Sequence, residues 1–143
     1  MDNAMEIARY IVTYCDKAGK AVSNLKLQKM LYFVWIDYYR ATKTPLFNEN
    51  FYAWQYGPVI PEVYCEFSTF AGIPINRQYE TQIDHTIDIT LLNTCIDSYI
   101  DFTAAELVEK SHREDGPWKR VYCNGEGSRK QIPTESIIAL ECE

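Results

Sequence analysis

The sequence has no long hydrophobic run. Its longest uninterrupted apolar stretch, Met30–Ile36, has seven residues, whereas a membrane-spanning helix needs about 20. Asp2 and Glu6 stand where a secretory signal would carry basic residues. We therefore expect a cytoplasmic protein with no membrane partner.

Histidine is scarce. His85 and His112 lie far apart, and neither belongs to an HxxxH or HExxH pattern. Because a zinc site needs three or four ligands at suitable spacing, the sequence predicts no metal site. The GxSxG motif of serine hydrolases and a phosphate-binding glycine loop are also missing. We expect no cofactor, no catalytic residues and no enzymatic activity.

The five cysteines form no CxxC pair, and their number is odd. Wide spacing favours reduced thiols that are mostly buried as small apolar groups. One alternative stays open, because the turn at Gly116-Pro117 could bring His112 close to Cys123. A thiolate nucleophile needs such a base, so a small thiol-dependent enzyme using Cys123 and His112 is an alternative function.

Positive charge is outnumbered, with 14 Lys and Arg against 20 Asp and Glu, a net charge of −6. Residues 1–60 carry 7 basic and 5 acidic side chains (7 − 5 = +2), and residues 61–143 carry 7 and 15 (7 − 15 = −8). Binding to a phosphate backbone needs clustered Lys and Arg, so the balance argues against a nucleic-acid partner. The acidic half suits a basic protein partner, although solvated helix faces would give the same count.

The length of 143 residues is typical of a single domain and sufficient for a core without disulfides. We expect one domain over 1–143, mainly α. The predicted architecture is a compact bundle of five to six helices, with a short extended or β-hairpin element around residues 51–56 and 73–80.

Several helix boundaries have clear signals. Ser23 is a candidate N-cap, and the helix after it is apolar on all sides in its middle, which predicts a central position. Pro61 suits a first helical turn, and Thr103 with Glu106 forms a capping box. Further helices are expected over 3–18, 88–101 and after Pro133, with an ordered loop at 116–118 and an exposed loop at 124–128.

Aromatic residues are abundant, with 11 Tyr, 6 Phe and 3 Trp. The run Phe51–Tyr56 alternates, so an extended backbone places Phe51 and Ala53 on one face and Trp54 and Tyr56 on the other. Core filling would explain one face. The other is a candidate contact platform, because Trp and Tyr are common anchors of protein interfaces.

Three sequence blocks resemble a known family. Residues 23–33 read SNLKLQKMLYF and resemble the NLKLQKLLYF segment of the SocA-like, or Panacea, antitoxin domain. Residues 51–64, FYAWQYGPVIPEVY, resemble its F-x-A-W-x-Y-G-P-V-x-P-x-V-Y block, and residues 111–118, SHREDGPW, resemble its H-x-E and P-W block. The resemblance covers about residues 5–140.

The resemblance implies a mostly helical, phage-associated or mobile-element protein that neutralises a cognate toxin by direct protein–protein binding. It also implies an alternative, in which the protein is an adaptor that delivers the toxin to a cytosolic protease. The family offers no established catalytic residues. Leu27, Leu31, Gly57 and Pro58 are expected to hold the fold. The residues expected to bind the toxin are Trp54, Tyr56, His112, Glu114, Asp115 and Trp118.

Overall fold

A long central helix organises the fold. The computed structural model describes residues 1–143, with seven α-helices, two 3₁₀ turns and three short strands. In chain order the elements are α1 (Ala4–Lys17), α2 (Asn24–Thr42), β1 (Phe51–Trp54), β2 (Gly57–Val59), α3 (Pro61–Phe67), η1 (Ser68–Phe70), α4 (Ile89–Asp97), α5 (Ala104–Ser111), α6 (Pro117–Tyr122), η2 (Cys123–Gly125), β3 (Gln131–Ile132) and α7 (Thr134–Glu141). The mainly-α prediction with a short hairpin is confirmed.

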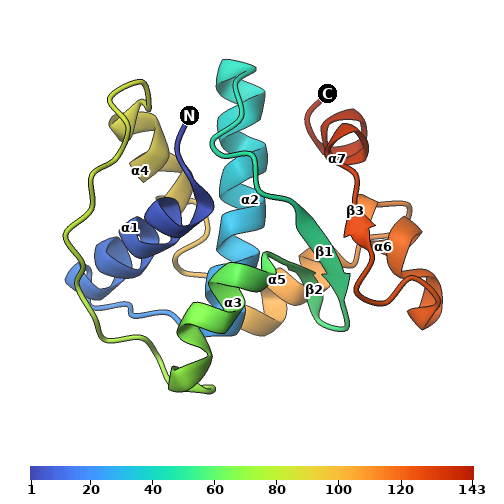
Figure 1. The fold of residues 1–143 in the computed structure, drawn as a ribbon, viewed down its shortest axis with the longest axis horizontal. Helices are drawn as coiled ribbons and strands as arrows, with labels where there is room; N and C mark the ends of the chain where they lie inside the picture. Colours follow the sequence, from blue (N-terminus) through green and yellow to red (C-terminus); the bar gives the residue numbers. More distant parts are fainter.

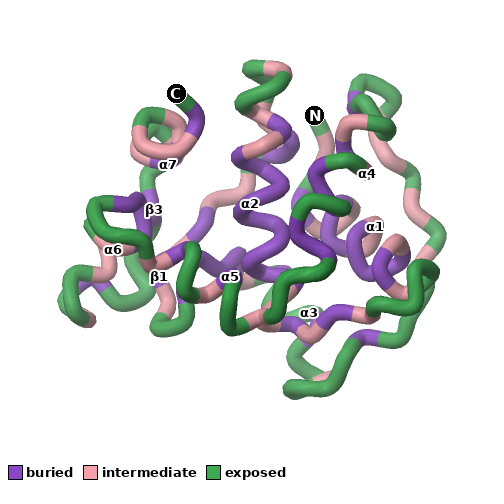
Figure 2. The backbone as a smooth tube through the Cα atoms, turned by 180° about the vertical axis from the view of Figure 1, so that it is seen from behind, coloured by how far each residue is buried: buried purple, intermediate pink, exposed green.

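Helix α2 occupies the position that its all-round apolar sequence predicts. It runs between α1 and α4 on one side and the sheet with α6 and α7 on the other (Figure 1). Figure 2 shows that most of α2 up to its last turns is buried. Leu27 and Leu31 are both 0% exposed. Because neighbours cover α2 on most faces, its apolar side chains from Leu27 to Tyr39 join one continuous core.

Side-chain caps begin four of the helices. Asn3, Ser23 and Asp88 accept hydrogen bonds from backbone N–H groups in the first turns of α1, α2 and α4. Thr103 and Glu106 form a complete capping box at α5. These contacts confirm the predicted starts of α2 and α5. None of the seven helices is both long and apolar enough to cross a membrane.

The strands form one antiparallel sheet in the order β2-β1-β3. In the hairpin Tyr52 pairs with Val59, and on the other edge of β1 Phe51 pairs with Ile132. Strand β3 therefore brings the C-terminal part of the chain against the hairpin.

Two predictions about local structure are wrong. The segment 73–80 forms no strand: Ile75 anchors it by burial and by a 2.8 Å hydrogen bond from its N–H to the Val22 carbonyl, while its mostly polar neighbours stay outside the core. The expected loop at 116–118 instead starts α6, because Pro117 sits at the first helical position. The helices accordingly number seven, not five or six.

Candidate functional site

The β1–β2 hairpin carries the aromatic run. Phe51 and Ala53 face inward and are 3% and 0% exposed, whereas Tyr52 and Trp54 are half-buried. Tyr56 lies at the hairpin tip with 58% exposure. The predicted alternation of the strand is confirmed, and one aromatic face stays accessible.

Two side chains of α2 form hydrogen bonds to the backbone at the end of the hairpin. Lys29 Nζ donates a 2.8 Å hydrogen bond to the Pro58 carbonyl, and Gln28 Oε1 accepts from the Ile60 N–H at 3.1 Å. Gly57 has φ +113, and a Cβ there would lie 2.6 Å from Ser111 Oγ and 2.7 Å from Lys29 Cε. A side chain at position 57 would therefore be strained, both by the backbone conformation and by these close contacts.

Lys29 is fully buried. Burial lowers the pKa of its amine to about 7, and no carboxylate is close enough to oppose this change. The amine therefore acts chiefly as a hydrogen-bond donor within the fold.

A stack of three rings supports the other side of the hairpin. The centres of the Trp118 and His112 rings lie 3.6 Å apart, with 3° between the ring planes. The centres of the Trp118 and Tyr122 rings lie 4.6 Å apart, with 15° between the planes. Trp118 Nε1 donates a 2.8 Å hydrogen bond to the Trp54 carbonyl. At 4% exposure the Trp118 ring has little surface to offer a partner, so its visible role is to position β1.

His112 is half-buried, and its Nε2 has no hydrogen-bond partner. Burial lowers its pKa, and the charges of Lys29 and Lys119 lower it further. The ring is thereby favoured in the neutral form, stacked on Trp118.

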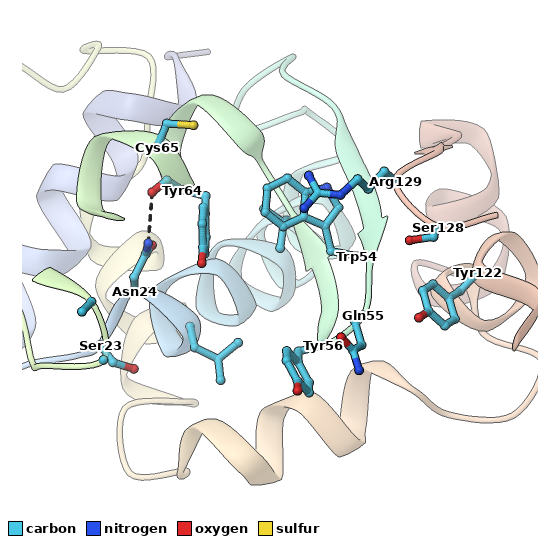
Figure 3. Close-up of a pocket in the computed structure, with 14 residues that line it drawn as sticks. Ser23, Asn24, Trp54, Gln55, Tyr56, Tyr64, Cys65, Tyr122, Ser128 and Arg129 are labelled. Carbon is cyan, nitrogen blue, oxygen red and sulfur yellow. Dashed lines mark hydrogen bonds between the residues drawn. The ribbon is translucent and has the colours of Figure 1, made fainter. Parts of the chain in front are cut away.

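A groove of about 720 Å³ opens beside the hairpin (Figure 3). One wall comes from the start of α2 and from α3, and the other from the hairpin and the segment before β3. The Trp54 and Tyr64 rings meet edge to face at 5.0 Å, and the Arg129 guanidinium lies over Trp54 at 4.2 Å. The lining residues are Ser23, Asn24, Leu25, Trp54, Gln55, Tyr56, Val59, Tyr64, Cys65, Ala71, Gly72, Tyr122, Ser128 and Arg129.

The six residues expected to bind a partner do not form one surface. Trp54 and Tyr56 line the groove, while His112 and Trp118 pack behind the hairpin. Glu114 and Asp115 lie on the exposed turn between α5 and α6, outside the groove lining, where Glu114 pairs with Lys119 at 3.4 Å.

Of the fourteen lining residues, only Trp54 and Tyr56 were expected to bind a partner, and the others include Tyr64, Tyr122 and Arg129. Tyr64 belongs to the second resembling block, which hinted at it, but Tyr122 and Arg129 carried no local signal. Arg129 reaches the groove because its N–H donates to the Ala53 carbonyl at 2.7 Å, a long-range contact.

Comparison with known proteins decides the family. The family model described as "Antitoxin SocA-like, Panacea domain" matches residues 27–119. The chain belongs to the SocA-like antitoxin family. The Antitoxin SocA of Caulobacter vibrioides (strain NA1000 / CB15N) is 36% identical over 140 residues, covering 88% of this chain and 73% of that protein. No solved structure matches the chain.

Membership of the SocA-like family supports an antitoxin role and suggests a function other than catalysis. The matched range contains Trp54, Tyr56 and Tyr64 but ends before Tyr122 and Arg129. Each wall of the groove therefore lies partly inside the matched range and partly outside it, because Ser23–Leu25 precede this range and Tyr122, Ser128 and Arg129 follow it.

The thiol chemistry considered from the sequence has little geometric support in this SocA-like chain. Cys123 is exposed and ends α6 with φ +47, and its sulfur makes no hydrogen bond to His112, whose ring stacks on Trp118. Cys15, Cys95 and Cys142 are buried, as expected for most of the thiols, while Cys65 and Cys123 are exposed. No group of three His, Cys, Asp or Glu side chains is arranged to hold a metal ion.

Proposed function

We propose that this protein is a cytoplasmic antitoxin that neutralises a cognate toxin by direct binding, with the toxin seated on the groove beside the hairpin. Family membership supports the antitoxin role. The observation that supports this location of the binding site is the accessible aromatic lining of the groove. Tyr56 and Tyr64 there are 58% and 37% exposed. Large exposed apolar side chains around a concavity are typical of protein-binding sites.

The proposed contact surface keeps Trp54 and Tyr56 at its centre. His112 and Trp118 contribute indirectly, because they hold β1 in place. Glu114 and Asp115 add negative charge on the turn between α5 and α6. The net charge of −6 would attract a basic toxin at long range, which raises the association rate more than the final affinity.

The test is co-expression with a candidate toxin, the product of the gene next to this protein's own, read by growth and by co-purification of the two proteins. We expect restored growth and a stable complex. Growth arrest that persists with no complex would refute neutralisation by binding.

Toxin half-life in the same cells separates inhibition from delivery to a protease. Direct inhibition leaves the half-life unchanged, because the bound toxin persists. A half-life that shortens only when the antitoxin is present would favour the adaptor alternative instead.

A further inference from the structure

Arg129 is a cation with an unused binding edge. Its guanidinium rests on the Trp54 ring at 4.2 Å, but it forms neither an ion pair nor a hydrogen bond within the chain. By contrast, Arg9 pairs with Glu66, and Arg113 pairs with Glu141. Stacking uses the flat face of a guanidinium and leaves the N–H donors at its edge free to bind two oxygen atoms.

The backbone holds Arg129 in this place. Its φ is +67, and its N–H donates to the Ala53 carbonyl, while the Ala53 N–H donates to the Lys130 carbonyl at 2.8 Å. These two bonds extend the pairing of β1 with the chain that leads into β3. The guanidinium is therefore presented at the groove by the sheet, which lowers the entropy lost on binding.

Arg129 is also the one charged residue among the fourteen that line the groove. The rest of the lining is uncharged, with Trp54, Tyr56, Tyr64 and Tyr122 providing rings. Close to such an apolar surface a charge pair is screened less than in open water, so a carboxylate placed on Arg129 would add both affinity and orientation. The local preference of the groove is thus for an acidic group, opposite to the overall charge of the chain.

We propose that the groove binds a short segment of the partner toxin in which an aromatic or large aliphatic side chain stands next to an aspartate or glutamate. The apolar side chain packs against Trp54, Tyr56 and Tyr64, and the carboxylate accepts hydrogen bonds from Arg129. This assignment rests on the proposed function for the identity of the partner. A polyanion is a poor fit, because a single cation on a chain of net charge −6 cannot neutralise a run of phosphates.

The first test uses a random heptapeptide library displayed on phage and selected on the whole protein, with no selection against any variant. We expect the recovered peptides to share an acidic residue beside an aromatic or large aliphatic one. The Lys130→Glu variant is the matched control, because Lys130 is an exposed neighbouring cation outside the groove lining. Its affinity for these peptides should stay within about threefold of the unaltered protein.

For the selected peptides, Arg129→Glu should weaken binding about 30-fold or more, the loss expected when one partner of a close charge pair is reversed. The affinity of Arg129→Lys for the peptides should lie between those of the unaltered protein and Arg129→Glu, since lysine keeps the charge but loses the planar guanidinium. Recovery of basic peptides, of peptides insensitive to Arg129→Glu, or of no shared sequence would overturn the proposal.

The second test measures binding of the neighbouring gene's product to the same variants. Toxin that binds the unaltered protein but not Arg129→Glu supports the proposal, and toxin that binds both equally refutes it while leaving neutralisation intact. If the unaltered protein binds no toxin, the proposed function fails. The peptide selection then still tests whether the groove binds an acidic residue next to an apolar one. Tight binding of a dT12 oligonucleotide, or a dimer that Tyr56→Ala abolishes, would assign the groove to another occupant and overturn the proposal.

Discussion

Lys29 Nζ donates a hydrogen bond to the Pro58 carbonyl across 2.8 Å, in a part of the core where no carboxylate balances the amine. This bond joins the central helix to the hairpin that carries Trp54 and Tyr56. Because a buried charge without a counter-ion is costly, the fold favours the neutral amine, and stability becomes dependent on pH.

Replacing Lys29 with methionine removes this dependence. The folded-state pKa is lowered to about 7 from 10.5, so between these values the unfolded chain binds a proton that the folded chain does not. Stability of the unaltered protein therefore rises with pH in this window, by up to about 1.4 kcal/mol per pH unit from this residue. Urea unfolding of the unaltered protein and of Lys29→Met at pH 7.0 to 8.5 measures this pH dependence of the free energy of unfolding. A stability difference that stays constant across this range would contradict the buried neutral amine.

Gly57→Ala is expected to destabilise the fold by about 2–4 kcal/mol, because the new Cβ meets both Ser111 and Lys29 at a backbone φ of +113. Gly125→Ala is the matched control: Gly125 has φ +102 but nothing within 4 Å of the added Cβ. The control should cost only the backbone strain, about 1–2 kcal/mol. Equal losses in thermal or urea unfolding would show that the hairpin tolerates the side chain.

His112→Phe keeps a ring on Trp118 but removes a titrating group whose pKa is lowered from 6.5. As pH falls below 6.5, the unfolded chain takes up a proton before the folded chain does, so the unaltered protein loses stability. The free energy of unfolding of His112→Phe, measured with urea, should fall less between pH 7 and pH 5 than that of the unaltered protein. His85→Gln is the control, since the His85 side chain is 97% exposed, and its pH profile should follow the unaltered protein. Parallel profiles for all three proteins would exclude His112 as the source.

Tyr56→Ala should abolish growth rescue in the co-expression assay while changing the unfolding free energy by less than about 0.5 kcal/mol, because the ring is mostly exposed. Phe102→Ala removes another exposed aromatic ring, 39% accessible and outside the groove lining, and should rescue growth normally. Rescue by Tyr56→Ala as strong as by the unaltered protein would place the toxin elsewhere on the surface.

Local signals predicted the elements that depend on local physics. Ser23, Pro61 and the Thr103–Glu106 box act through atoms within one helical turn, so their pattern in the sequence was sufficient. Strand β3 was missed because its two residues become a strand only by pairing with Phe51 and Tyr52. Trp118 was expected to be a surface anchor, and only the packing of α5 and α6 shows that its ring is covered.

The groove followed the same division. The alternation of Phe51–Trp54 predicted that its residues divide between two faces, since this depends on one strand, but it did not indicate which face is covered. Arg129 could not be found in this way, because its place depends on a left-handed backbone and on bonds to Ala53, more than seventy residues earlier.

The late position of Tyr122, Ser128 and Arg129 in the chain has a consequence for biosynthesis. A ribosome releases the hairpin well before it releases the residues that complete the second wall of the groove. A nascent chain therefore lacks part of the groove lining until Arg129 has been released, so a partner that uses both walls of the groove, as proposed above, can bind only after that point in synthesis.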